Sequence, residues 1–408
     1  MNYDFMRAHG VASEKQATLN KIAVGSIKIP AVKDKDWLKL TPPSQNEEKF
    51  IGVYAVHPGS NFIALRAKGA YTVDWGDGVI ENFNNNATAE HEYIYNDIDQ
   101  SEQTLTSRGF KQVIVTVTPQ SNHSLTMLDL NRRHSIYQSI NNSGFVDIVI
   151  NAPTLSSLAI STIGANNTAQ LIRFSMLERV SIYKNALTDT RYLFYNCASL
   201  REVRYFDMQS VLNAGSTFYG CLDLVTANII NSSNVTNLDY MFRDCFSLEE
   251  APSFDTSDAT RAIGMFMNCY ILKKVPLYDF SNVLYLDNLF YNCYLLETTP
   301  AFNTANVISI NDMFRNCYSL LVVPEYDFSK VISANNLFVS CGQLYSIRFN
   351  NMKKGFSLAY CKLGSEALNE LYDRLGVVSN QAITVVGNYG VRADSTGPAV
   401  AKGWIVSG

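Results

Sequence analysis

The chain has 408 residues, a formal net charge of −4, and only 17% charged residues. A weakly acidic chain of this kind has no general electrostatic attraction for DNA or RNA, which excludes nucleic-acid binding as its broad function. Hydrophobic residues make up 47% of the sequence, enough to fill the cores of the two or three domains that the length allows.

Residues 1–48 are predicted to form an extended N-terminal anchoring arm that docks on a neighbouring subunit. The segment begins MNYDFMRAHGVASEKQATLNKIAVG and ends in the polar run TPPSQNEE. It lacks the continuous apolar core of a secretory leader, and no later run reaches the roughly 18 apolar residues of a membrane span. We therefore expect no membrane insertion.

Residues 49–120 are predicted to form a small antiparallel β-sandwich, because short runs such as FIGVYAV, NFIALRA and FKQVIVTVT alternate with turn residues. The WGDG motif at 75–78 and the HEY motif at 91–93 resemble the polycystic-kidney-disease (PKD) type of immunoglobulin-like domain. The resemblance implies a tight turn at WGDG and a later strand that begins at HEY. Asp77 and His91 could hold a cation, but a turn and a local hydrogen bond explain them, so we assign no metal site.

Residues 121–196 are predicted to form irregular leucine-rich coils. The spacing LxxLxLN occurs at 125–131, and looser versions of it follow at 145–151, 155–160 and 177–182.

Residues 197–360 are predicted to form a regular solenoid of 24-residue coils, because a fixed period of this length indicates one structural unit stacked on copies of itself. Seven cysteines stand 24 residues apart, each with a phenylalanine three residues before it and a leucine three residues after it. They are Cys197, Cys221, Cys245, Cys269, Cys293, Cys317 and Cys341. These side chains are expected to point inward, with the cysteines as reduced thiols. Their proximity in adjacent coils leaves a disulfide open, and the absence of a CxxC pair disfavours zinc.

Two further positions of the repeat predict where each coil bends. Asp or Asn recurs ten residues after each cysteine, and such side chains cap backbone groups at turns. Four coils carry a proline seven residues after the cysteine, which is expected to end a short strand. The four are Pro252, Pro276, Pro300 and Pro324.

Residues 361–408 are predicted to form a C-terminal cap. Cys361 breaks the period, and Leu368, Leu371 and Leu375 have helical spacing within the segment 365–375. A cap is expected because an open last coil would expose its apolar face.

The unit MFRDCFSLEEAPSFDTSDATRAIG at 241–264 and the NVTN sequence at 234–237 resemble the BspA-like leucine-rich repeats, as does the closing stretch with Ala401, Lys402, Gly403 and Trp404. The resemblance covers roughly residues 190–408. It implies surface proteins, adhesins and phage virion proteins that recognise something outside. It implies no chemistry and no shared binding residues.

No catalytic motif is present in the sequence: GxSxG, HExxH, GxxxxGK and a GxGxxG after a strand are all missing. Glu249 and Glu250 could form a glycosidase pair, but Lys273 and Lys274 stand one coil later and favour a charge ladder between adjacent coils. We therefore expect a protein that is not an enzyme and needs no cofactor.

The candidate binding surface is a set of six residues that we call the recognition stripe, because stacked Tyr and Arg are typical of recognition surfaces. Phe246, Tyr270, Tyr294 and Tyr318 each follow a cysteine by one position, and Tyr291 and Arg315 each precede one by two. Self-stacking that stiffens the turn is the alternative.

The function that we expect is that of a bacteriophage virion protein, made in the host cytoplasm, joined to other virion proteins through the arm, and presenting the solenoid to a host glycan or protein. An architectural part of a capsid, tail or baseplate is the first alternative. A bacterial cell-surface adhesin whose leader was removed is the second, although Met1 argues against it.

Overall fold

The structure is a computed structural model that describes residues 37–408, except for 60, 100–104, 107–108, 133, 137–143, 161–175 and 392–393. Most of the predicted arm therefore lies outside the described residues. Its last part, from Trp37 onward, belongs to the compact unit of residues 36–408. The backbone N–H of Leu38 donates to Gln112 Oε1 at 3.0 Å, and Asn151 Nδ2 donates to the carbonyl oxygen of Glu47 at 2.7 Å.

Two β-sheets form the first part of this unit, as the alternation of apolar and polar residues predicts. The strands of this part are β1 (Lys49–Val56), β2 (Phe62–Lys68), β3 (Tyr71–Asp74), β4 (Ile80–Phe83), β5 (Thr88–Glu92), β6 (Lys111–Pro119), β7 (Met127–Asp129), β8 (Phe145–Asn151) and β9 (Ser157–Ala159). One sheet contains the order β8-β1-β6-β3-β4 and the other the order β5-β2-β7-β9. Ile63, Leu65, Val73, Trp75 and Val115 are buried in the core that the two sheets share.

The sandwich and the solenoid are joined through a continuous sheet. β1 pairs antiparallel with β6 on one side and with β8 on the other. β8 then pairs in parallel with β10 (Arg179–Ile182), which pairs in parallel with β11 (Glu202–Asp207), and β11 with β12 (Thr226–Ile230). The stretch between residues 120 and 196 thus adds strands to both sheets of the sandwich. The exact domain boundaries stay predictions.

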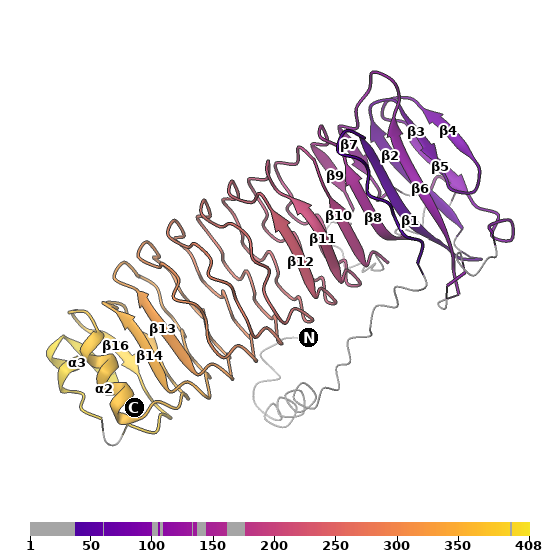
Figure 1. The fold of residues 1–408 in the computed structure, drawn as a ribbon. Coiled ribbons are helices and arrows are strands. Elements are labelled where there is room, and N and C mark those ends of the chain that lie inside the picture. The colour runs from indigo at the N-terminus through magenta and orange to yellow at the C-terminus, as the bar shows by residue number, and fades with distance from the viewer. Residues whose placement is uncertain are drawn as a thin grey trace. The chain divides into compact units, whose positions relative to one another are not determined.

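The solenoid prediction is confirmed, since coils of about 24 residues are stacked in a row and drawn from magenta to orange in Figure 1. Every cysteine, phenylalanine and leucine of the three predicted columns is fully buried between 197 and 344. The phenyl rings from Phe194 to Phe338 lie one above another with centroids 5.3–5.9 Å apart. Residues one coil apart therefore lie in register, and each coil buries its apolar side against its neighbours.

The bends occur where the Asp and Asn side chains predict them. Oδ1 of Asp255 accepts the backbone N–H of Ser257 at 2.9 Å, and Asp279 and Asp327 repeat the contact two residues on. These side chains replace the backbone partners that a bend removes.

The proline prediction is wrong in one coil. β13 (Val322–Asp327) runs through Pro324 and pairs in parallel with β14 (Ser346–Asn350), with a shift of register between Val323 and Tyr326. The irregularity leaves proline in a position where no ladder hydrogen bond is required of it. In the coils of Pro252, Pro276 and Pro300, the β-type backbone contacts between described residues are isolated bridges. One such bridge joins Glu250 to Lys274.

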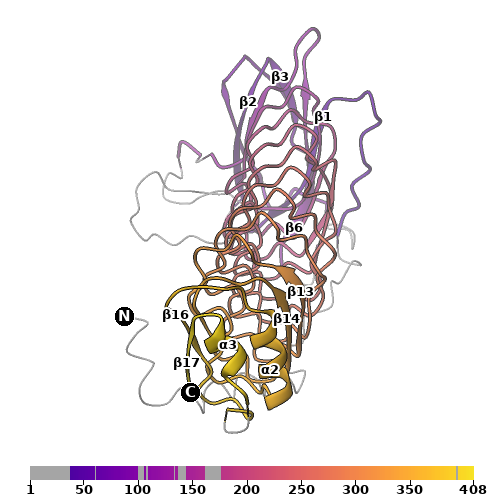
Figure 2. The same ribbon diagram turned by 90° about the vertical axis from the view of Figure 1, so that its left-hand side faces the viewer.

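The C-terminal segment adds two helices to the end of the solenoid, and its role as a cap stays a prediction. Helix α2 (Ser365–Arg374) buries Leu368, Leu371 and Tyr372 over the last coils, and the short helix α3 (Gly397–Ala401) buries Ala399. β15 (Phe356–Ser357), β16 (Gln381–Thr384) and β17 (Trp404–Ser407) form a parallel sheet. Figure 2 looks along the coils onto both helices. Within the described part of the chain, no helix is both long and apolar enough to cross a membrane.

Candidate functional site

Each regular coil makes a tight double turn just before its cysteine, and we call the row of these turns the turn edge. Two residues in each turn have positive φ, five residues and one residue before the cysteine. Asn288 and Asn292, for example, have φ of 57° and 62°. Only glycine takes this left-handed conformation without cost, and Asn and Asp tolerate it better than other residues. This explains the Asn, Asp, Gly or Ser that stands before every ladder cysteine.

The asparagines before the cysteines form an amide ladder along the turn edge. Nδ2 of Asn268 donates to Asp244 Oδ1 at 2.6 Å. Asn292 donates to Asn268 and Asn316 donates to Asn292, both at 2.8 Å. The ladder connects four consecutive coils at the same depth. Sequence reasoning missed it, although the repeated Asn at a fixed position was a readable signal.

Four residues of the recognition stripe stack directly on one another beside this ladder. The ring centroids of Phe246 and Tyr270 are 4.7 Å apart, those of Tyr270 and Tyr294 are 4.9 Å apart, and those of Tyr294 and Tyr318 are 5.1 Å apart. The ring planes of the first two pairs are nearly parallel, with interplanar angles of 16° and 11°. All four rings are half-buried, and burial raises the pKa of the Tyr294 hydroxyl. Neighbouring rings cover each other's faces, and the hydroxyl oxygen of Tyr318 is buried.

Tyr and Arg both occur at the other stripe position, two residues before the cysteine. The guanidinium of Arg315 lies over the ring of Tyr291, 5.9 Å from the centroid, and Arg243 lies over Tyr219 at 4.8 Å. Arg315 also pairs with Asp312, with Nη1 and Oδ1 3.0 Å apart. Cation–π contacts of this kind hold the arginines along the turn edge.

The structure therefore brings the six stripe residues onto one edge of the solenoid, with the amide ladder between their two columns. Tyr291 and Tyr294 flank Asn292 in one turn, and Arg315 and Tyr318 flank Asn316 in the next. Whether this edge binds a ligand stays a prediction.

The ladder thiols face away from this edge, into the core. The thiol of each cysteine from Cys221 to Cys341 donates to the backbone carbonyl oxygen of the phenylalanine 27 residues earlier, with Sγ···O distances of 3.0–3.3 Å. Burial raises the pKa of these thiols, so they stay protonated. Cys361 donates to Phe338 in the same way and so holds the next place in the row, after a shorter coil.

The glutamates weighed as a catalytic pair lie in a charge ladder, as predicted. Lys273 Nζ lies 2.5 Å from Glu249 Oε1, and Lys274 pairs with Glu250 in the same way. All four side chains are exposed on adjacent coils, where the lysines neutralise both acids.

The sandwich holds Asp77 and His91 in a local cluster. His91 Nε2 lies 2.7 Å from Asp77 Oδ2, and its ring stacks on Trp75 with centroids 5.0 Å apart. Asp77 Oδ1 accepts the N–H of Val79, which makes it the turn residue expected of it. The HEY motif ends β5 rather than beginning a strand, because its histidine already pairs with Ile63 of β2.

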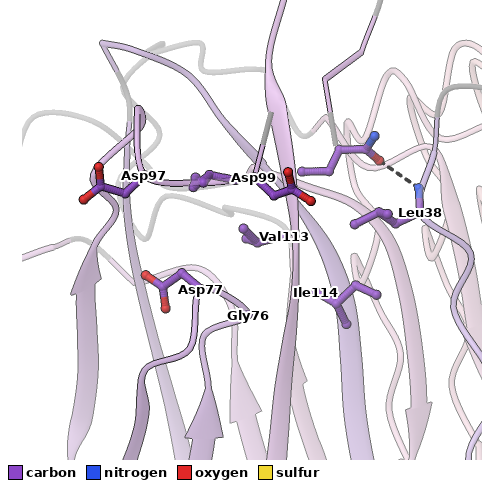
Figure 3. A pocket seen from close by; sticks show the side chains of 9 residues that line it. Leu38, Gly76, Asp77, Asp97, Asp99, Val113 and Ile114 are labelled. Carbon is purple, nitrogen blue, oxygen red and sulfur yellow. Dashed lines mark hydrogen bonds between the residues drawn. The ribbon is translucent and has the colours of Figure 1, made fainter. Parts of the chain in front are cut away.

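A cavity of about 450 Å³ opens beside this cluster, between the WGDG turn and the start of β6 (Figure 3). Carboxylates of Asp77, Asp97 and Asp99 line it together with Leu38 and Gln112. Within the described residues no group of three or more His, Cys, Asp or Glu side chains is placed to hold a metal ion.

The regular coils are similar to a known repeat family. Residues 188–299 and 262–356 match the profile of a family described as "Mycoplasma protein of unknown function, DUF285". No curated protein matches the chain. The fold and this match define the class of protein as a β-solenoid repeat protein, in agreement with the resemblance to BspA-like repeats. The family description assigns no activity.

Proposed function

We propose that the protein is a non-enzymatic recognition protein of a bacteriophage virion, held to other virion proteins through its N-terminal arm, residues 1–48, and presenting its solenoid to a host glycan or protein. The observation that carries the proposal is the turn edge. Six aromatic and arginine side chains from four coils lie there in register around an amide ladder.

A repetitive edge of this kind suits a ligand that is itself repetitive or extended. Adjacent parallel strands lie about 4.8 Å apart, so equivalent side chains recur along the solenoid at about that interval. Half-buried aromatic and guanidinium groups lose little conformational entropy on binding, which favours them as contact residues. Contact is expected through the exposed parts of the half-buried rings and through the guanidinium group.

The PKD-type resemblance of residues 49–120 is compatible with the same recognition role. The pairing of β1 with β8 fixes this sandwich to the first coil. A sandwich joined in this way would act as a rigid spacer between the arm and the turn edge. A bacterial cell surface is the alternative location for the same role.

The test is host adsorption by particles that carry Tyr270→Ser, Tyr294→Ser and Tyr318→Ser together. We expect adsorption to fall at least tenfold while circular dichroism shows the solenoid folded. The matched control is Leu212→Ser, Leu284→Ser and Ile332→Ser, three exposed residues of one other column of the coils. Unchanged adsorption of the stripe variant, or an equal loss in the control, would remove the turn edge as the site.

A purely architectural role is the second candidate, and the ring stacking favours it, because stacked rings also stiffen the coils. A map of the intact particle separates the two roles. The turn edge exposed to solvent supports recognition, and the turn edge covered by neighbouring subunits supports architecture.

A further inference from the structure

The aromatic column of the turn edge is interrupted at Gly342. The four stacked rings from Phe246 to Tyr318 follow one another with centroids 4.7–5.1 Å apart. The next coil carries Gly342 at this position, 24 residues after Tyr318. A Cβ atom added at Gly342 would meet no heavy atom within 4 Å, so open space stands where the column would hold its next ring.

The amide ladder ends at the same coil. Ser340 stands before Cys341, at the position where the three preceding coils have asparagine. Nδ2 of Asn316 donates to Asn292, but within the described part of the chain neither Asn316 Oδ1 nor Ser340 Oγ has a hydrogen-bond partner. The gap formed by Ser340 and Gly342, which we call the notch, therefore combines open space with two polar groups that a ligand can bind.

Tyr360 bounds the notch from the next coil. The backbone N–H of Ser340 donates to the carbonyl oxygen of Ala359 at 3.2 Å, just as that of Asn316 donates to Val339, so Tyr360 continues the column of the asparagines. Its ring is 65% exposed and has no ring contact among the described residues. Its φ of 65° is a left-handed conformation that a bulky side chain takes only with strain. Strained residues of this kind are concentrated at functional sites.

The notch has the width of one ring. The coils of Tyr318 and Tyr360 are two intervals apart, which is about 10 Å at the spacing of parallel strands. One ring placed over Gly342 would therefore continue the stack at the interval of the rings before it. The polar groups favour a sugar ring, because its hydroxyl groups can pair with Asn316 Oδ1 and Ser340 Oγ. An aromatic side chain would cover both atoms without replacing their hydrogen bonds to water, which costs free energy.

We propose that the notch binds one pyranose ring of a host glycan. The ring lies over Gly342 with its C–H face toward Tyr318, and its hydroxyl groups pair with Asn316 and Ser340. Tyr360 covers the sugar from the next coil. This assignment rests on the proposed recognition role of the turn edge, and it narrows the ligand of that edge to a glycan held at one coil.

The first test is a printed array of bacterial capsular, O-antigen and cell-wall glycans, probed with the labelled full chain. We expect the wild type to bind at least one glycan, whose affinity is then measured by titration calorimetry. Gly342→Tyr fills the notch with the missing ring and should weaken this binding by about tenfold or more. Gly342→Ala adds only a methyl group to open space and should keep the affinity within about twofold.

Tyr360→Ser is the second variant, since it removes an exposed ring without touching the core, and it should also weaken binding. The matched control is Tyr285→Ser, at a tyrosine outside the turn edge that is 36% exposed, and it should bind as the wild type does. No glycan bound by the wild type, or unchanged binding in a folded Gly342→Tyr or Tyr360→Ser chain, would overturn the proposal. Binding of N-acetyltryptophanamide in place of every glycan would identify an aromatic side chain as the occupant and overturn it too.

Host adsorption separates the notch from the proposed function. Particles with Gly342→Tyr should lose adsorption, as should particles with the triple change to serine at Tyr270, Tyr294 and Tyr318. If only the triple variant loses adsorption, the turn edge remains the recognition site and the notch is excluded. If both variants adsorb as the wild type does, the turn edge and the notch are excluded together.

Discussion

The thiol of Cys269 donates a hydrogen bond to the backbone carbonyl oxygen of Phe242, with Sγ and O 3.1 Å apart across 27 residues of chain. The contact ties the inward side of one coil to the turn of the coil before it. It recurs from Cys221 to Cys361, so the thiol row is a hydrogen-bonded column as well as a packed one.

Cys269→Ala should lower the free energy of unfolding by about 1–3 kcal/mol, because a buried carbonyl oxygen loses its donor and a small void forms. Cys269→Ser keeps a donor and should cost less than Cys269→Ala. Urea denaturation measures both. Equal stability of Cys269→Ala and wild type would show that the contact contributes nothing.

The ladder thiols should resist alkylation in the folded protein. Burial raises their pKa, to about 12 for Cys361, so the reactive thiolate is scarce at pH 8. We expect no iodoacetamide labelling of the native chain at pH 8 by intact mass, and eight labels after denaturation. Rapid labelling of the native chain would contradict the buried column.

Asn292 tests the amide ladder and the left-handed backbone separately. Asn292→Gly removes the amide but tolerates φ of 62°, whereas Asn292→Ala removes the amide and adds strain. The alanine variant should be less stable than the glycine variant by about 1 kcal/mol. Chemical denaturation of the two variants measures the difference, and an alanine variant as stable as the glycine variant would exclude strain at this turn.

Tyr278 supplies a hydrogen-bond donor to a backbone carbonyl oxygen of the preceding coil. Its buried hydroxyl donates to the carbonyl oxygen of Pro252 at 2.6 Å, and Tyr326 donates to Pro300 two coils later. Tyr278→Phe should cost about 1–3 kcal/mol, because the carbonyl oxygen stays buried without its donor. Tyr285→Phe, at an exposed tyrosine of the same coil, is the control and should change the stability little.

Alkaline pH should destabilise the sandwich. Burial raises the pKa of Tyr71 to about 12, so the folded state favours the neutral phenol. This contribution is fully present below about pH 10, where both states are protonated, and it is lost as the pH rises through 12. The melting temperature should fall between pH 10 and 12, and less steeply in Tyr71→Phe. An equal slope in both proteins would contradict the assignment to Tyr71.

The repeat positions were predictable because packing imposes the same residue at the same depth in every coil. Cys269, Phe266 and Leu272 carry this signal in their period alone. The stacking of Tyr270 on Tyr294 and the pairing of Glu249 with Lys273 follow from the same register.

Contacts outside the period could not be predicted. β1 and β8 are separated by about ninety residues, and only the folded sheet brings Phe50 opposite Ile150. The bond from Tyr278 to Pro252 depends on which way a buried hydroxyl points, and sequence spacing does not encode that direction. The course of β13 through Pro324 depends on a local shift of register, which sequence spacing does not encode either.

The most direct test of the account is the arrangement of the cysteine sulfur atoms, measured by anomalous diffraction from a crystal of the protein. In-register coils predict eight sulfur peaks in a single row with a spacing of about 5 Å, including one for Cys361 at the end. Cysteine sulfurs scattered at unrelated positions would contradict the stacked solenoid itself.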